Sequence, residues 1–163
     1  MSTIKTIVNV GIADTKTVRS PNTIRTLGLG SCVGTVLYDE RNGIAGLSHI
    51  LLPDSSQARA GNVSPMKYAD TAIPQLLEML QGQGARNMKA KIAGGAQMFQ
   101  VGKGTSFMRI GDKNIEAVQD ALQKLNIKVV SSDVGGNLGR TIEFDPVTSK
   151  LSIRKRNHDV FTI

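Results

Sequence analysis

The sequence has 163 residues, 40% of them hydrophobic and 20% charged, and this composition is typical of one soluble globular domain with a sizeable core. Its single cysteine excludes an internal disulfide framework, and no apolar run reaches the roughly 18–20 residues of a membrane helix. The net charge of +7 fits either a solvated basic surface or an acidic protein partner. We therefore expect a single domain over residues 1–163, located in the cytoplasm.

Nucleic acid and nucleotides match the sequence poorly. The basic residues are scattered, and the one cluster, Arg154-Lys155-Arg156, has no aromatic residues to stack bases. Gly102-Lys103-Gly104-Thr105 fails the Walker pattern, because Gln97 stands where its first glycine belongs. Gly28-Leu29-Gly30 fails the dinucleotide fingerprint, because Val33 replaces its third glycine. We expect no nucleic-acid partner, no cofactor and no metal site.

The first half of the chain is dominated by strand patterns and turn residues. β-Branched residues favour strands, and an Asn-Gly dipeptide between two apolar runs predicts a hairpin. In chain order the expected segments are a strand at 4–13, a loop at 14–22, a strand at 23–27, hairpin strands at 33–38 and 44–52, and a surface loop at 54–64.

The second half alternates helices with strands. Ser64-Pro65 is a typical helix start, and Pro74 predicts a kink or a break within that helix. The remaining expected segments are a strand at 87–93, a helix at 111–125, a strand at 127–132, a hairpin with strands at 140–144 and 150–155, and a polar tail at 157–159. Many strands with two principal helices predict an α+β fold of two mixed sheets packed face to face and flanked by helices.

The first hairpin carries the most reactive side chains, and its register decides whether they meet. A two-residue loop would place Val36 opposite His49, whereas a four-residue loop over residues 39–42 would place Cys32 there. Directly opposed residues have Cβ atoms about 4.5–5.5 Å apart, close enough for a thiolate–imidazolium pair. The sequence alone allows both registers. It also allows a plain reading in which Cys32 and His49 are buried core residues.

Three features favour a thiol-nucleophile site. Cys32 follows the glycine-rich turn Gly28-Leu29-Gly30-Ser31, where backbone N–H groups can face an oxyanion. Thr26 offers a hydroxyl and a carbonyl that could orient the far nitrogen of His49. A cysteine, a histidine and an orienting oxygen are the parts of such a site.

These residues also lie in motifs that resemble a known family, the chemoreceptor glutamine deamidases called CheD. The resemblance runs from about residue 8 to about residue 155, with one departure at Ala93, where the family often has a bulkier apolar residue. The similar segments are Thr26-Leu27-Gly28-Leu29-Gly30-Ser31-Cys32-Val33, Gly46-Leu47-Ser48-His49-Ile50-Leu51-Leu52-Pro53, Tyr68-Ala69-Asp70-Thr71-Ala72-Ile73-Pro74 and Lys91-Ile92-Ala93-Gly94-Gly95-Ala96-Gln97-Met98-Phe99.

The resemblance implies a function and a set of roles. Cys32 would be the nucleophile, His49 the base and Thr26 the third member of a triad that converts receptor glutamine to glutamate. It also implies a β-sandwich with helices, shared with bacterial toxins that deamidate glutamine, and a second partner, the chemotaxis phosphatase CheC. A non-enzymatic adaptor role and a transglutaminase-like transfer to an amine remain alternatives at this point.

Further residues are expected around this centre. Backbone N–H groups around Ser31-Cys32 would stabilise the oxyanion, with Gly30, Ser31, Gly94 and Gly95 as its oxyanion or support residues. The pair Gly94-Gly95 marks either a close approach beside Cys32 or a simple turn. Large apolar residues among glycines predict a rim that receptor and phosphatase share, or else part of the core; they are Met98, Phe99 and Phe107.

Overall fold

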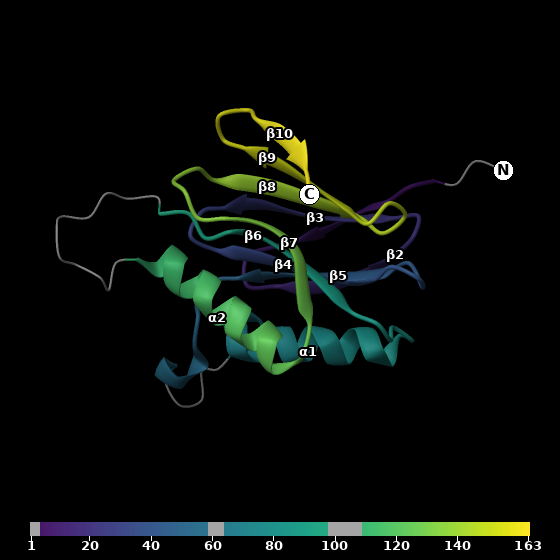
Figure 1. Cartoon of the computed structure of the whole chain (residues 1–163), viewed down its shortest axis with the longest axis horizontal. Coiled ribbons are helices and arrows are strands. Elements are labelled where there is room, and N and C mark those ends of the chain that lie inside the picture. Colours follow the sequence, from purple (N-terminus) through teal and green to yellow (C-terminus); the bar gives the residue numbers. More distant parts are fainter. Residues whose placement is uncertain (1–3, 59–63, 98–108) are drawn as a thin grey trace.

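The computed structural model describes residues 4–58, 64–97 and 109–163, and these form two β-sheets and two main helices (Figure 1). The strands are β1 Ile7–Val10, β2 Thr15–Arg19, β3 Thr23–Leu29, β4 Val33–Asp39, β5 Ile44–Ile50, β6 Lys89–Gly94, β7 Lys128–Val134, β8 Arg140–Asp145, β9 Lys150–Lys155 and β10 Val160–Thr162. The helices are α1 Ala69–Gly82 and α2 Ile110–Lys124, with short 3-10 turns η1 Ser55–Gln57 and η2 Pro65–Lys67.

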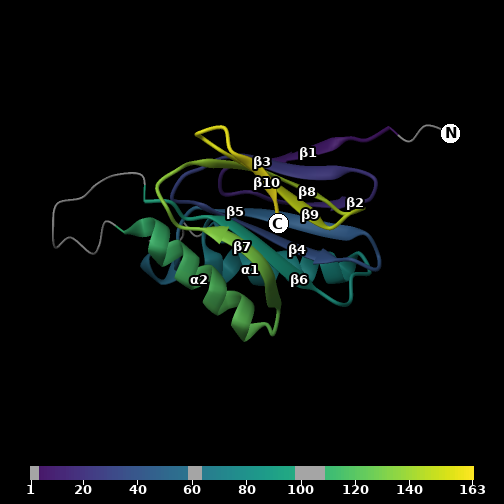
Figure 2. The same cartoon turned by 45° about the horizontal axis from the view of Figure 1, so that its top comes forward.

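The elements stack in three layers. One sheet has the order β1-β3-β8-β9-β10 and faces a second sheet of order β2-β5-β4-β6-β7, and both helices pack on the outer face of the second sheet (Figures 1 and 2). Each sheet is mixed, because β1 runs parallel to β3 and β6 runs parallel to β7 while the other pairs are antiparallel. The expected α+β sandwich is confirmed, with the helices on one side only.

Two hydrophobic cores follow from the alternation of side chains along β4, β5 and β6. Leu37, Ile50 and Ile92 point toward α1 and α2, whereas Val36 and Leu47 point between the sheets. Both faces of β4 and β5 are therefore covered, and every residue of these two strands is buried. A strand that is covered on both faces reads as a continuous apolar run, which explains why this hairpin dominates the sequence pattern.

Two strands and one helix boundary differ from the sequence expectation. Strand β2 lies in the stretch that the sequence assigns to a loop. The sequence does not reveal this strand because its two buried residues are Thr15 and Val18, and only Val18 is strongly apolar. Strand β10 directly follows the expected polar tail. The helical break occurs at Tyr68, whose backbone is extended between η2 and α1, while Pro74 lies inside α1. Within the described residues, no helix is long and apolar enough to cross a membrane.

Candidate active site

The ends of several strands meet at one end of the sandwich, around the connection from β3 to β4. Leu29 pairs with Arg140 in the first sheet, while Val33 pairs with both Ile50 and Gly94 in the second. Cys32 lies in the connection between the two sheets, immediately before β4. Residues from both sheets and from α2 can therefore reach the thiol loop.

The register of the β4–β5 hairpin differs from both expected registers. Asp39 pairs with Ile44, and Gly34 lies directly opposite His49. Cys32 directly precedes β4, two residues before Gly34, and packs in the core between the sheets, which places it near the diagonal position to His49. Diagonal neighbours are about 7–8 Å apart, with Cβ atoms somewhat closer. The expectation of direct opposition is wrong by one diagonal step, but both side chains point between the sheets.

His49 is held by a hydrogen bond that crosses the sandwich interior. Its Nδ1 lies 2.7 Å from Thr26 Oγ1 on β3, and the same hydroxyl donates to Val10 O at 2.7 Å. Since the hydroxyl has only one hydrogen, Nδ1–H must donate to Thr26, which leaves Nε2 unprotonated in the neutral ring. Nε2 is buried and has no hydrogen-bond partner among the described residues, and His49 as a whole is 0% exposed. This orientation leaves a free base lone pair in the interior.

Burial keeps both reactive groups neutral at rest. It lowers the pKa of His49 from 6.5 to about 4, and it raises the pKa of the Cys32 thiol, an effect that the Cys32 backbone N–H partly opposes. At neutral pH the pair is a thiol and a neutral imidazole, not the thiolate–imidazolium pair considered from the sequence. Among the described residues no hydrogen bond joins Cys32 to His49. Both residues are buried, but Cys32 is 8% exposed and His49 is 0% exposed.

Gly94 and Gly95 pack directly behind the thiol loop. Gly94 has φ of +115°, and a Cβ on this residue would overlap the carbonyl oxygen of Cys32. The N–H of Gly95 donates to that carbonyl at 2.8 Å, and the next N–H, of Ala96, donates to Gly30 O at 2.8 Å. The expected close approach beside Cys32 is present. Because the Gly95 N–H is already used, this residue supports the loop and cannot also donate to an oxyanion.

Comparison with known proteins shows the family to which the chain belongs. The family model described as CheD chemotactic sensory transduction matches residues 51–155. The chain belongs to the CheD family. A probable chemoreceptor glutamine deamidase CheD of Oceanobacillus iheyensis is 57% identical over 160 residues, covering 97% of this chain and 96% of the relative. The chemoreceptor glutamine deamidases CheD of Halalkalibacterium halodurans and Bacillus subtilis are 52% and 48% identical, covering 91% and 94% of this chain and 93% and 95% of those relatives.

The CheD family model begins after Cys32 and His49, so it says nothing about them. The alignment with the Oceanobacillus relative covers 97% of the chain and therefore includes both positions.

A residue that the sequence interpretation missed, Asn114, clamps the site from α2. Its side chain is fully buried, and its Nδ2 donates to Ser31 O at 3.0 Å and to Leu51 O at 3.1 Å. It thereby joins the residue before Cys32 to the chain just after His49. An asparagine four residues before the buried Val118, on the helix stripe that faces the core, was the available signal. The contacts themselves depend on tertiary packing.

The first turn of α2 approaches the glycine pair very closely. A Cβ on Gly111 would lie 2.6 Å from the carbonyl oxygens of Gly95 and Ala96, and a Cβ on Gly95 would overlap the Ile115 side chain. The N-terminal end of α2 thus packs against the backbone that supports Cys32.

The remaining predicted positions divide into two groups. Gly30 and Ser31 lie in the turn before Cys32, where their carbonyls are held by Ala96 and Asn114. The expected rim residues Met98, Phe99 and Phe107 lie outside the described residues. Within the described residues no three His, Cys, Asp or Glu side chains gather as metal ligands would.

Proposed function

We propose that this CheD-family protein deamidates glutamine side chains of chemoreceptors, with Cys32 as nucleophile, His49 as general base and acid, and Thr26 as the residue that orients His49. The observation that carries the proposal is that His49 Nε2 has no partner in the part of the chain that the structure describes, on the same inner face as Cys32, while Thr26 fixes Nδ1. The names of the relatives, chemoreceptor glutamine deamidases, support the substrate class.

The neutral resting pair supports a general-base mechanism. Cys32 Sγ attacks the carboxamide carbon as its proton moves to His49 Nε2, which forms a tetrahedral intermediate with a negative oxygen. The imidazolium then gives this proton to the leaving nitrogen, so ammonia departs and a thioester remains. Water attacks the thioester carbon while His49 Nε2 takes a proton from this water. That proton returns to sulfur, and the products are glutamate and the free thiol.

The turn that precedes Cys32 supports the oxyanion role. Its carbonyls are fixed by Ala96 N–H and by Asn114, which leaves the peptide planes of Gly30, Ser31 and Cys32 in defined orientations. Preorganised backbone N–H groups stabilise a developing oxyanion without reorganisation during the reaction. We assign this role to the N–H groups of Ser31 and Cys32.

The wider setting follows from the family. We propose that the chain acts as one domain over residues 1–163, in the cytoplasm, and that a CheC-type phosphatase is a second partner. The phosphatase proposal rests on the family resemblance, and its proposed contact residues Met98, Phe99 and Phe107 belong to the segment outside the described residues.

Mass spectrometry tests the proposed reaction. A chemoreceptor cytoplasmic domain incubated with the protein should gain the mass change of amide to acid at specific glutamines. Cys32→Ala should abolish this gain. Thr35→Val is the matched folded control, because it removes a buried hydroxyl on the other face of β4 that has no partner within the described residues. Undiminished conversion by Cys32→Ala would contradict the proposal, and an amine adduct in place of the acid would favour transfer to amines.

A further inference from the structure

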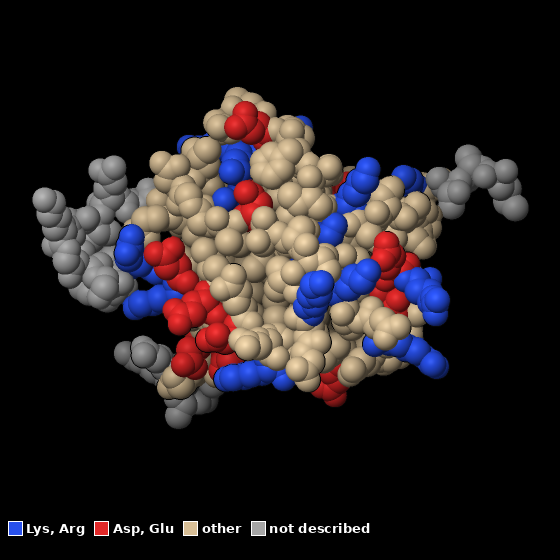
Figure 3. Space-filling model, viewed as in Figure 1, with Lys and Arg blue, Asp and Glu red and all other residues tan. Residues whose placement is uncertain are grey.

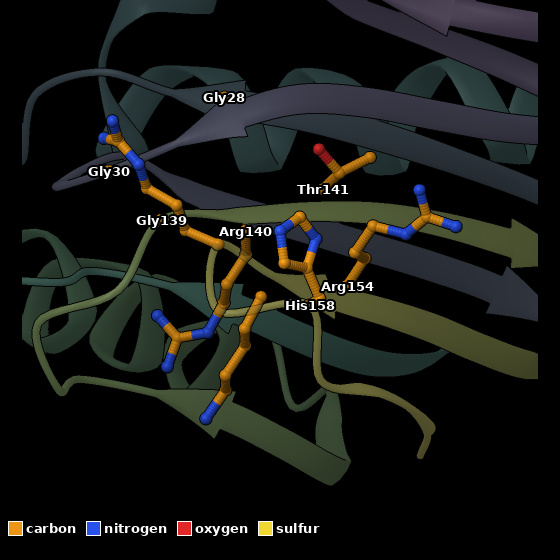
Figure 4. Close-up of a pocket in the computed structure, with 9 residues that line it drawn as sticks. Gly28, Gly30, Gly139, Arg140, Thr141, Arg154 and His158 are labelled. Carbon is orange, nitrogen blue, oxygen red and sulfur yellow. The ribbon is translucent and has the colours of Figure 1, made fainter.

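A basic groove adjoins the thiol loop at the same end of the sandwich. It has a volume of about 480 Å³ and lies between the β3–β4 turn, the start of β8 and the β9–β10 hairpin (Figure 4). Its lining residues are Gly28, Gly30, Gly139, Arg140, Thr141, Arg154, Lys155, Arg156 and His158. In Figure 4 the His158 ring lies between the side chains of Arg140 and Arg154. The lining contains cationic side chains and no carboxylate.

The cations of this groove divide into a structural pair and a free pair. Arg140 donates to Asp133 Oδ2 at 2.8 Å, and Lys155 lies 3.6 Å from the other oxygen of this carboxylate. Arg154 and Arg156 are exposed, and in the part of the chain that the structure describes neither forms an ion pair. Acidic side chains gather elsewhere, over α2 at the lower left of Figure 3, where Asp112, Glu116 and Asp120 are exposed. None of the described carboxylates lines the groove itself, although Glu143 and Arg154 line a neighbouring hollow, so the groove carries net positive charge.

Backbone contacts fix the groove relative to Cys32. Gly30 lines the groove and precedes Cys32 by two residues, so their Cα atoms are at most about 7 Å apart. On the other wall, Arg140 donates to Gly135 O at 2.9 Å, and Gly135 N–H donates to Gly94 O at 2.9 Å. Gly94 in turn packs against the Cys32 carbonyl. The groove therefore lies beside the loop that carries Cys32.

We propose that this groove binds a carboxylate of the protein substrate, from an acidic side chain close in space to the target glutamine. Two arginine side chains can hold carboxylates in paired hydrogen bonds, which a neutral side chain cannot match. One turn of a helix spans about 5.4 Å, so an acidic residue three or four positions from the glutamine would reach the groove. This proposal rests on the proposed deamidase function and names a feature of its substrates.

Two synthetic peptides test the preference. Each peptide carries one glutamine. The acidic peptide has Glu at the positions three and four residues before and after this glutamine, and the neutral peptide has Ala at the same positions. Exposed charge pairs contribute modestly, so the wild-type protein should show a roughly three- to tenfold higher kcat/KM for the acidic peptide at low salt. In Arg154→Gln/Arg156→Gln this ratio should fall to about one.

A charge-matched control separates the groove from net charge. Lys128→Gln/Lys150→Gln removes the same charge from two exposed residues, which lie at the ends of β7 and β9 that are away from the groove. This variant should keep the wild-type ratio. Equal turnover of both peptides by the wild-type protein, or an unchanged ratio in Arg154→Gln/Arg156→Gln, would overturn the proposal.

A binding measurement keeps the proposal testable if neither peptide is deamidated. Fluorescence anisotropy of the labelled acidic peptide with Cys32→Ala protein should show binding that weakens with salt and weakens again in the arginine double variant. Binding without turnover would contradict the deamidase function and leave the groove supported. Equal binding of the two peptides would overturn the groove proposal. A DNA duplex that binds the groove more tightly than the acidic peptide would also overturn it, in favour of nucleic acid.

Discussion

Thr26 Oγ1 on β3 lies 2.7 Å from His49 Nδ1 on β5 and joins the two sheets inside the sandwich. The hydroxyl donates a hydrogen bond to Val10 O on β1, so three strands share one short network. A histidine with one nitrogen fixed in this way keeps one tautomer, with the other nitrogen available as a base. The sequence offered either the hydroxyl or the carbonyl of Thr26 for this role, and the contact uses the hydroxyl.

Replacing Thr26 should therefore cause a large loss of kcat with only a moderate loss of unfolding free energy. Thr26→Val leaves Nδ1–H buried without a partner, which costs about 1–3 kcal/mol, and frees the ring to rotate. We expect kcat to fall by about 100-fold, the cost of a misplaced catalytic group. Thr26→Ser should retain most activity. The measurements are steady-state deamidation and urea unfolding.

Thr35→Val is the matched control for Thr26→Val. Thr35 is also a fully buried threonine, but its Oγ1 has no hydrogen-bond partner among residues 4–58, 64–97 and 109–163. Its replacement by an apolar group of the same shape should leave stability equal or higher and leave kcat near the wild-type value. Equal losses in Thr26→Val and Thr35→Val would show that the Thr26 hydroxyl has no specific role.

Gly94 should be required because of its contact and not only because of its backbone angle. Gly94→Ala places a methyl group against the Cys32 carbonyl, so the thiol loop must move. Gly84 also has positive φ, +98°, but a Cβ there meets nothing within 4 Å. Gly84→Ala should cost about 1 kcal/mol of stability with normal kcat. Gly94→Ala should lose considerably more stability and most activity; similar behaviour of the two variants would contradict this account.

The sequence predicted much of this site, but not its register. The hairpin was evident because both of its strands are apolar throughout and a turn dipeptide lies between them. A change of one or two residues in the length of the hairpin loop changes which residues of the two strands are paired. No local sequence feature favoured the observed pairing of Gly34 with His49 over the other registers. Strand β2 was missed because its pattern is polar. Asn114 was missed because its partners are carbonyls distant in sequence, which only the packing of α2 brings together.

Asn114 should act by positioning the thiol loop. Asn114→Ala removes donors to the carbonyls of Ser31 and Leu51, and we expect a loss of about 1–3 kcal/mol in unfolding free energy. Because the loop carries Cys32, kcat should fall while KM for a receptor domain changes little. Gln119→Ala, at an exposed position of the same helix, is the control. A normal kcat in a measurably destabilised Asn114→Ala would show that the clamp is structural only.

The neutral thiol should be evident in its alkylation. Burial raises the pKa of Cys32 above its ordinary value of 9.0, and His49 with a pKa of about 4 is not a cation at neutral pH. The rate of reaction with iodoacetamide should therefore be slow at pH 7 and continue to rise above pH 9, since the thiolate is the nucleophile. Mass spectrometry follows the single cysteine directly. A rate that reaches its plateau below pH 7 would indicate a thiolate–imidazolium pair instead.

The buried His49 should also make folding stability depend on pH in a defined window. In the folded protein its pKa is about 4, below the ordinary 6.5, so below pH 6.5 the unfolded chain binds a proton that the folded protein excludes. Stability from this residue is complete above pH 6.5, decreases as pH falls toward 4 and changes no further below. The total is on the order of 3 kcal/mol, at 1.36 kcal/mol per pKa unit. Urea unfolding of wild type and His49→Gln between pH 7.5 and 4 isolates this contribution, because all other groups titrate in both proteins. The wild type should lose more stability than His49→Gln across this window, and parallel curves would show that His49 is protonated inside the fold.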